Sequence, residues 1–164
     1  MELYDPRLDA AVRHMRQVSL RPTVKAFLTD LRFENPVSFL ADDPNICKVN
    51  LPGGGINQGE SLASALVREL REETDIPLEI ILQYIRRGRV LTFGTVPTSR
   101  KSRAKAIWVV ALPVADVCLV WGKKGQLKEP EIHTDSSSFL RRLVRAQDTR
   151  PETASLYRTA LEWL

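Results

Sequence analysis

Short apolar runs, separated by polar segments that contain glycine or proline, make up much of this chain. Runs of this length that are rich in β-branched and aromatic residues, and end at turn residues, are typical of strands. The pattern predicts strands at 23–31, 37–42, 46–51, 105–114 and 117–122, and one or two more within 77–96. The third strand runs into Pro52-Gly53-Gly54-Gly55, which no regular element can contain.

Helical spacing of apolar residues predicts three further elements, a short helix at 9–18 and two helices at about 136–147 and 152–164. Their inward-facing residues would be Ala11, Val12 and Met15 in the first, Phe139, Leu140, Leu143 and Val144 in the second, and Leu156, Ala160, Leu161 and Leu164 in the last. A fourth helix is predicted to begin near Glu60-Ser61. Ser61 is a candidate N-cap there, and Glu60 lies favourably near the positive end of the helix.

That fourth helix has three stripes of side chains when its residues are placed at 100° intervals. The core-facing stripe holds Ala63, Leu66, Val67 and Leu70, the acidic stripe holds Glu69, Glu72 and Glu73, and the remaining side holds Ser64, Arg68 and Arg71. A helix that is merely solvated would need only two stripes, so the acidic one calls for a separate explanation.

The acidic stripe is chemically suited to a divalent metal ion. Glu69 lies three and four residues before Glu72 and Glu73, so each pair is about 5–6 Å apart at Cβ and repels without a counter-charge. Mg²⁺ or Mn²⁺ would turn the stripe into a set of hard oxygen ligands, and Mg²⁺ shares its other sites with water and substrate phosphates. Arg68 can reach Glu72 or Glu60 and would orient a carboxylate. A solvated acidic face is the alternative, and the adjacent glycine loop argues against it.

The segment from Gly54 to Ile76 resembles the Nudix hydrolase signature, G-x5-E-x7-R-E-U-x-E-E-x-G-U, where U is bulky and aliphatic. Gly54 and Glu60 fill its first two fixed positions, Arg68-Glu69-Leu70 the next three, and Glu72-Glu73 and Ile76 the last. Asp75 stands where the family has glycine. So many fixed positions within one segment make a far stronger signal than a lone glycine-rich loop.

The resemblance implies an α/β fold, an α/β/α sandwich with a mixed sheet, as one domain over residues 1–164. It also implies hydrolysis of a nucleoside diphosphate linked to another moiety, with Mg²⁺ or Mn²⁺. Glu69, Glu72, Glu73 and the Gly54 carbonyl would be metal ligands, and one glutamate would help to deprotonate the attacking water. Glu60 and Arg68 would hold the geometry of the loop and helix.

Two regions are left open by this resemblance. The family glycine ends the helix, often with a positive φ, and we expect Asp75 to adopt that conformation or to remodel the turn slightly. Many family members add an acidic metal ligand from a late loop. Glu129, Glu131 and Asp135 are the candidates here, and the sequence does not choose among them. His133 in the same loop could act as a base, although a solvent-facing histidine is the commoner case.

The charge pattern favours a polyanionic substrate. The formal net charge is +4, and basic residues gather at 86–89, 100–105, 123–124 and 141–142. Arg100, Lys101 and Arg103 could close over phosphates. We therefore favour a nucleoside triphosphate, a dinucleoside polyphosphate or an RNA 5′ end as the substrate. Phe93 or Trp121 could stack on a base, whereas Trp108 is expected to pack in the core.

Nothing in the sequence predicts a membrane protein. No apolar run approaches the ~20 residues that span a bilayer, and the N-terminus does not have the pattern of a signal peptide. Cys47 and Cys118 are the only cysteines and are expected to be free and buried. These features favour a cytoplasmic protein.

The leading hypothesis is a metal-dependent Nudix pyrophosphohydrolase. The alternative is a catalytically weak Nudix-fold module that binds a nucleotide or RNA, and the complete glutamate set argues against it. An isomerase acting on isoprenoid diphosphates is less favoured, because that branch of the family has an altered signature. The C-terminal helices could pair in a homodimer.

Overall fold

A mixed β-sheet forms the centre of the computed structural model, which describes residues 1–32, 36–40, 49–74, 76–97, 104–114, 131–132 and 151–163. The strands are β1 (Arg21–Thr29), β2 (Pro36–Leu40), β3 (Val49–Asn50), β4 (Arg89–Val96), β5 (Lys105–Pro113) and β6 (Glu131–Ile132). Their order is β3-β2-β1-β5-β4, with β6 paired to β2. β1 and β5 are parallel along all of β1, and the other pairs are antiparallel.

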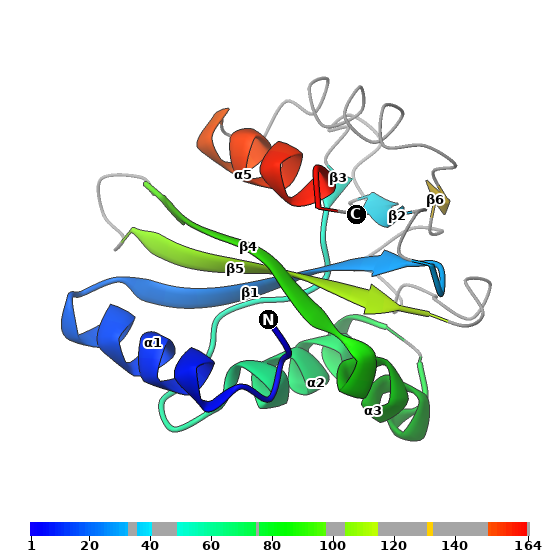
Figure 1. Cartoon of the computed structure of the whole chain (residues 1–164), viewed down its shortest axis with the longest axis horizontal. Helices are drawn as coiled ribbons and strands as arrows, with labels where there is room; N and C mark the ends of the chain where they lie inside the picture. The colour runs from blue at the N-terminus through cyan, green and yellow to red at the C-terminus, as the bar shows by residue number, and fades with distance from the viewer. Residues whose placement is uncertain are drawn as a thin grey trace.

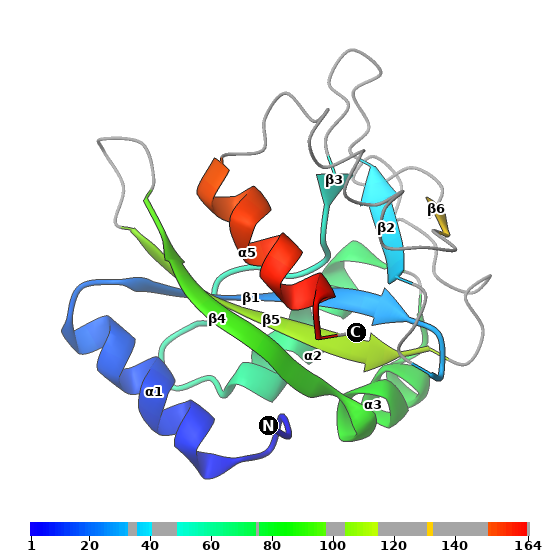
Figure 2. The ribbon, with the colours of Figure 1, turned by 45° about the horizontal axis from the view of Figure 1, so that its top comes forward.

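Helices cover both faces of this sheet (Figures 1 and 2). α1 (Pro6–Gln17), α2 (Leu62–Glu73) and α3 (Leu78–Arg87) lie on one face, and α5 (Pro151–Leu161) lies on the other. Alternation along the strands divides the core accordingly, because Val24, Ala26 and Leu28 pack with the first three helices while Phe27 packs with α5. The predicted α/β sandwich with a mixed sheet is confirmed.

α1 is held firmly at both ends. The Asp5 carboxylate caps its first turn by accepting the Arg7 N–H at 2.9 Å, and Pro6 follows at the first helical position. At the other end, the Leu20 N–H donates to the Met15 carbonyl and the Ser19 N–H to the Arg16 carbonyl, with Ser19 at φ 62°. This is a Schellman motif, which fixes the turn from α1 into β1.

The prediction of strands throughout 77–96 is wrong for its first half, because residues 78–87 form α3. Ile81 and Ile85 are buried one turn apart with Tyr84 between them, which is helical periodicity. Isoleucines favour strands locally, but here the packing of this face against α2 and β5 determines the element. Only β4, from Arg89, matches the prediction.

The other predicted elements that the structure describes are confirmed, with shifts of a few residues at their ends. These are the strands at 23–31, 37–42 and 105–114, the described part of the strand at 46–51, and the helices at 9–18 and 152–164. Leu156, Ala160 and Leu161 are buried as expected. Trp108 is buried in the core. The predicted strand at 117–122, the helix at 136–147, Trp121, Cys47, Cys118 and Leu164 lie outside the described residues. Within the described part of the chain, no helix has the length and apolar character needed to cross a bilayer.

Candidate active site

The glycine loop takes the place of a strand beside the first half of β1. β2 pairs only with the last two residues of β1, so the earlier residues need other partners. Three backbone hydrogen bonds of 2.9–3.0 Å supply them, from the Val24 N–H to the Gly54 carbonyl, from the Ala26 N–H to the Pro52 carbonyl and from the Ile56 N–H to the Pro22 carbonyl. The loop is therefore an extension of the sheet, in a fixed register with β1.

Two glycines in this loop lie where a Cβ would meet another atom closely. Gly53 has φ 123°, and a Cβ there would overlap the Val24 carbonyl oxygen. Gly54 lies directly against the Glu69 carboxylate, and a Cβ there would occupy the position of that carboxylate. The second contact brings a glutamate of α2 onto the bare backbone of the loop.

α2 begins where the sequence predicts. Ser61 is the N-cap and its hydroxyl accepts the Ser64 N–H at 3.0 Å. The predicted core stripe is confirmed, since Ala63, Leu66 and Leu70 are buried and Val67 packs partly buried against the core. Anchoring this stripe fixes the rotation of the helix, so the acidic stripe faces the loop edge of the domain.

Arg68 connects the loop to the acidic stripe. Its guanidinium forms a two-bond pair with Glu60, through Nε to Oε1 at 2.9 Å and through Nη2 to Oε2 at 3.0 Å. It also donates to the Gly55 carbonyl at 2.8 Å, to Glu69 at 2.6 Å and to Glu72 at 3.4 Å. The predicted reach of Arg68 to Glu60 and Glu72 is confirmed, and one planar group thus orients three carboxylates.

Glu60 in turn closes the turn before the helix. Its Oε2 accepts the Asn57 N–H at 2.8 Å, and the Glu60 N–H donates back to the Asn57 carbonyl at 3.1 Å. Burial acts to raise the pKa of Glu60, but the hydrogen bonds from Arg68 and the Asn57 N–H outweigh it and lower that pKa. Glu60 is therefore held in its charged form.

Glu73 faces the loop from the last turn of α2. Its Oε2 accepts the Gly53 N–H at 2.7 Å. Burial raises the pKa of this carboxyl, and the negative charges of Glu69 and Glu72 raise it further, against the opposing effects of the Gly53 N–H and the Lys25 charge. These influences show that the three glutamates and Lys25 lie within electrostatic range of one another.

Lys25 is a site residue that the sequence did not reveal. From β1 its ammonium donates to the Leu51 carbonyl at 2.9 Å and to the Gly53 carbonyl. A single lysine within the predicted strand "TVKAFLTDL" was the available signal, but a partner 26–28 residues away cannot be read from spacing. Lys25 and Glu73 thus bind the carbonyl and the N–H of the same residue, Gly53.

The donor set suits Mg²⁺ or Mn²⁺. Glu69 and Glu73 already lie against the glycine loop, and Glu72, whose side chain is 57% exposed, lies next to them on the same stripe. No three acidic, histidine or cysteine side chains converge as a ready ligand cluster among the residues that the structure describes. Glu69 and Glu72 both accept hydrogen bonds from Arg68, and Glu73 accepts one from the Gly53 N–H. Mg²⁺ and Mn²⁺ bind carboxylate oxygens of this kind, and the three glutamates lie on one face of α2.

The Gly54 carbonyl, the predicted fourth ligand, already accepts the Val24 N–H at 3.0 Å. A carbonyl oxygen has a second lone pair, so this hydrogen bond leaves one position for a cation. The Gly53 carbonyl is engaged by Lys25 instead.

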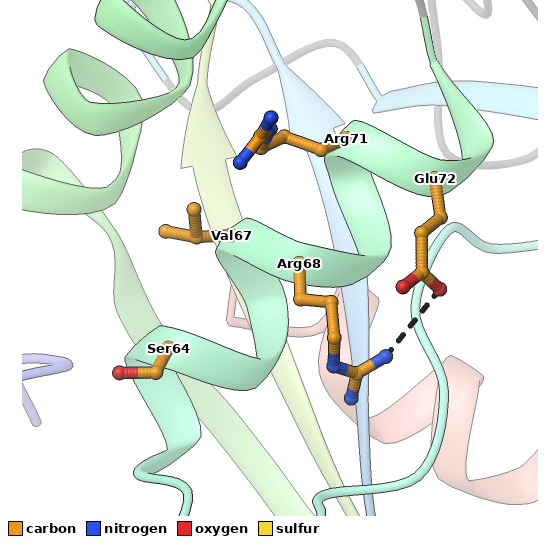
Figure 3. Close-up of a pocket in the computed structure, with 5 residues that line it drawn as sticks. All are labelled: Ser64, Val67, Arg68, Arg71 and Glu72. Atoms are coloured by element: carbon orange, nitrogen blue, oxygen red, sulfur yellow. Dashed lines mark hydrogen bonds and ion pairs between the residues drawn. The ribbon is translucent and has the colours of Figure 1, made fainter.

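A hollow of about 410 Å³ follows the exposed side of α2 (Figure 3). It is lined by Ser64, Val67, Arg68, Arg71 and Glu72. Figure 3 shows Arg68 and Glu72 joined on one side of the helix, with Arg71 on the other. A ligand in this hollow would therefore lie against the most exposed of the three glutamates and two guanidinium groups.

Several predicted site residues fall outside the described part of the chain. These are Asp75, Glu129, His133, Asp135, Arg100, Lys101 and Arg103.

α2 ends at Glu73, and Thr74 is its extended C-cap, so the helix stops at the predicted place. Glu131 lies in β6, opposite Ser38 of β2. Phe93 is 43% exposed and packs against Trp108, with ring centroids 4.8 Å apart.

Solved structures share this fold. A Deinococcus radiodurans protein, DR0079, aligns with a TM-score of 0.58 at 17% identity, over 85% of this chain and 82% of its own. A MutT NUDIX hydrolase from Burkholderia pseudomallei aligns with a TM-score of 0.55 at 18% identity, over 88% and 98%. An Ap4A hydrolase from C. elegans aligns with a TM-score of 0.54 at 17% identity, over 85% and 94%. Identities this low establish the similarity of fold alone.

The sequence itself also matches a known family. No curated protein matches the sequence. A family model described as the NUDIX domain matches residues 20–163, which include β1, the glycine loop, α2 and α5. Since that match covers most of the chain, this protein belongs to the NUDIX domain family.

Proposed function

We propose that this protein is a metal-dependent hydrolase that cleaves a diphosphate bond in a nucleoside diphosphate linked to another moiety. The observation that carries the proposal is the arrangement of α2 against the glycine loop. Arg68 orients Glu69 and Glu72, and the Gly53 N–H holds Glu73, so Glu69 and Glu73 lie against the loop with Glu72 next to them on the same stripe. A stripe of repelling charges held this firmly is suited to a cation.

Each residue has a distinct role in this proposal. Glu69, Glu72, Glu73 and the Gly54 carbonyl would hold Mg²⁺ or Mn²⁺, and one of the three carboxylates would take a proton from the attacking water. A bound divalent cation would neutralise the negative charge that develops on the phosphate oxygens. Arg68, paired with Glu60, fixes the carboxylates, so little reorganisation is needed when the substrate binds.

The substrate is proposed to be highly anionic. The net charge of +4 and the guanidinium groups of Arg68 and Arg71 along the hollow on α2 support this. A nucleoside triphosphate, a dinucleoside polyphosphate or an RNA 5′ end carries the phosphates that such a surface would attract.

Product analysis tests the proposal. The protein would be incubated with Mg²⁺, and separately with Mn²⁺, and a panel of nucleoside triphosphates, dinucleoside polyphosphates, nucleotide sugars and 5′-triphosphorylated RNA, with products identified by mass. We expect metal-dependent release of a nucleotide and a second phosphorylated product from at least one class, and the masses identify the bond cleaved. Tight nucleotide binding by calorimetry with no product under either metal would contradict the proposal and favour a binding module.

A further inference from the structure

α1 precedes the residues that the NUDIX domain model matches, yet it contacts the turn that follows the glycine loop. The last turn of α1 presents Arg16, whose Nη2 donates to the Ile56 carbonyl and to the Asn57 carbonyl, the latter at 2.6 Å. These two residues lie 40 and 41 positions further along the chain. A part of the chain outside the matched domain therefore binds directly to the signature segment.

The Ile56 and Asn57 carbonyls belong to the turn that binds Glu60. Two hydrogen bonds join Asn57 and Glu60. The Asn57 N–H donates to the Glu60 carboxylate, and the Glu60 N–H donates to the Asn57 carbonyl. Glu60 is also the two-bond partner of Arg68, which orients Glu69. A continuous series of contacts thus runs from Arg16 through Asn57, Glu60 and Arg68 to a proposed metal ligand.

Arg16 is held at a fixed distance from this turn. Leu8 and Val12 bury the inner side of α1, and the Schellman motif at its C-terminus fixes its junction with β1. Between α1 and residues 58–61 there is a hollow of about 450 Å³ with a polar lining that includes Asp9, Arg13 and Gln58. Apolar packing does not fill this space, so Arg16 spans the gap with charge-assisted hydrogen bonds.

We propose that Arg16 is a positioning residue of the active site, which fixes the Asn57–Glu60 turn and thereby the Glu60–Arg68 pair that aligns the glutamates. This inference rests on the proposed function for its effect on catalysis. The N-terminal helix is then a functional part of the site. Its sequence signal is weak, because an arginine in the last turn of a helix is also favoured by the helix dipole.

The test compares Arg16→Ala with Arg16→Lys and with Arg13→Ala, which removes the same charge from the same helix one turn earlier. Hydrogen exchange followed by NMR measures the exchange rates of the Asn57 and Glu60 amides, and steady-state kinetics measures kcat. We expect Arg16→Ala to exchange at least ~10-fold faster at these two amides, with the β5 amides unchanged, and to lose ~10–100-fold in kcat, as for other residues that orient metal ligands. Arg13→Ala should match the wild type in both measurements.

Arg16→Lys should recover most of both effects. An ammonium can donate to two neighbouring carbonyls, as Lys25 does with Leu51 and Gly53. Unchanged exchange at Asn57 and Glu60 in Arg16→Ala would overturn the inference. So would equally faster exchange across β1 and β5, because Arg16 would then stabilise only the fold. If the wild type hydrolyses no substrate, the proposed function fails, and the exchange measurement still decides the role of Arg16.

Discussion

The two faces of the sheet are stabilised in different ways. On the α2 face, the loop edge is held by charge-assisted hydrogen bonds from Arg16 and Arg68 to carbonyls and carboxylates. On the α5 face, apolar side chains of the sheet and of α5 pack against each other. Phe27 meets Tyr157 edge to face with ring centroids 6.0 Å apart, and burial raises the pKa of the Tyr157 hydroxyl. The α2 face therefore positions the arginines and glutamates of the site, and both faces bury apolar side chains.

The largest effect is expected at the point where the loop joins β1. Gly53→Ala places a Cβ against the Val24 carbonyl at a φ that disfavours alanine, and we expect a loss of about 3 kcal/mol of stability. Gly54→Ala instead displaces only the flexible end of Glu69, so turnover should fall while thermal stability changes little. Thermal unfolding and kinetics on both variants check this. Equal melting temperatures for the two would contradict it.

Arg68→Lys tests the charged face alone. An ammonium cannot reproduce the two-bond pair with Glu60 while also reaching Glu69 and the Gly55 carbonyl. We expect turnover to fall on the order of 10–100-fold with a cooperative unfolding transition retained. Arg13→Lys, a change at an exposed residue of α1, is the control and should behave as the wild type. If the turnover of Arg68→Lys is within twofold of that control, Arg68 does not orient the glutamates for catalysis.

Gly94→Ala tests the opposite face. A Cβ on Gly94 would lie 2.7 Å from Leu156 Cδ1, so α5 must shift slightly or Leu156 must change rotamer. We expect a loss of about 1 kcal/mol of stability, measured by denaturant unfolding, and unchanged turnover. If this variant lost as much activity as Arg68→Lys, the two faces would not be functionally separable.

The smallest effect concerns pH. The folded pKa of Glu60 lies below its ordinary value of 4.5, so the carboxylate contributes stability above about pH 4.5, and that contribution is lost as the pH falls through the folded pKa. The melting temperatures of the wild type and Glu60→Gln should differ most at neutral pH and converge in acid. Glu79→Gln, an exposed change on α3, is the control. A difference that stays constant from pH 7 to pH 3 would contradict the assignment.

The sequence predicted what short-range spacing can encode. The stripes of α2, its Ser61 cap and the reach of Arg68 all follow from positions within one or two helical turns. α3 was mistaken for a strand because its isoleucines favour strands, and only packing on α2 and the sheet determines a helix there. Lys25 and Arg16 were missed because their partners lie 26–41 residues away and are brought close by the sheet and by the end of α1.

In the proposed function, the acidic stripe of α2 performs the hydrolysis. The decisive experiment measures the turnover of the best substrate, with Mg²⁺, for Glu72→Gln and Glu73→Gln against Glu79→Gln. Each of the first two variants removes one negative charge from the stripe, with little change in shape. We predict that turnover falls on the order of 10²–10³-fold for at least one of them and stays unchanged for Glu79→Gln. Undiminished turnover in both Glu72→Gln and Glu73→Gln would contradict the account.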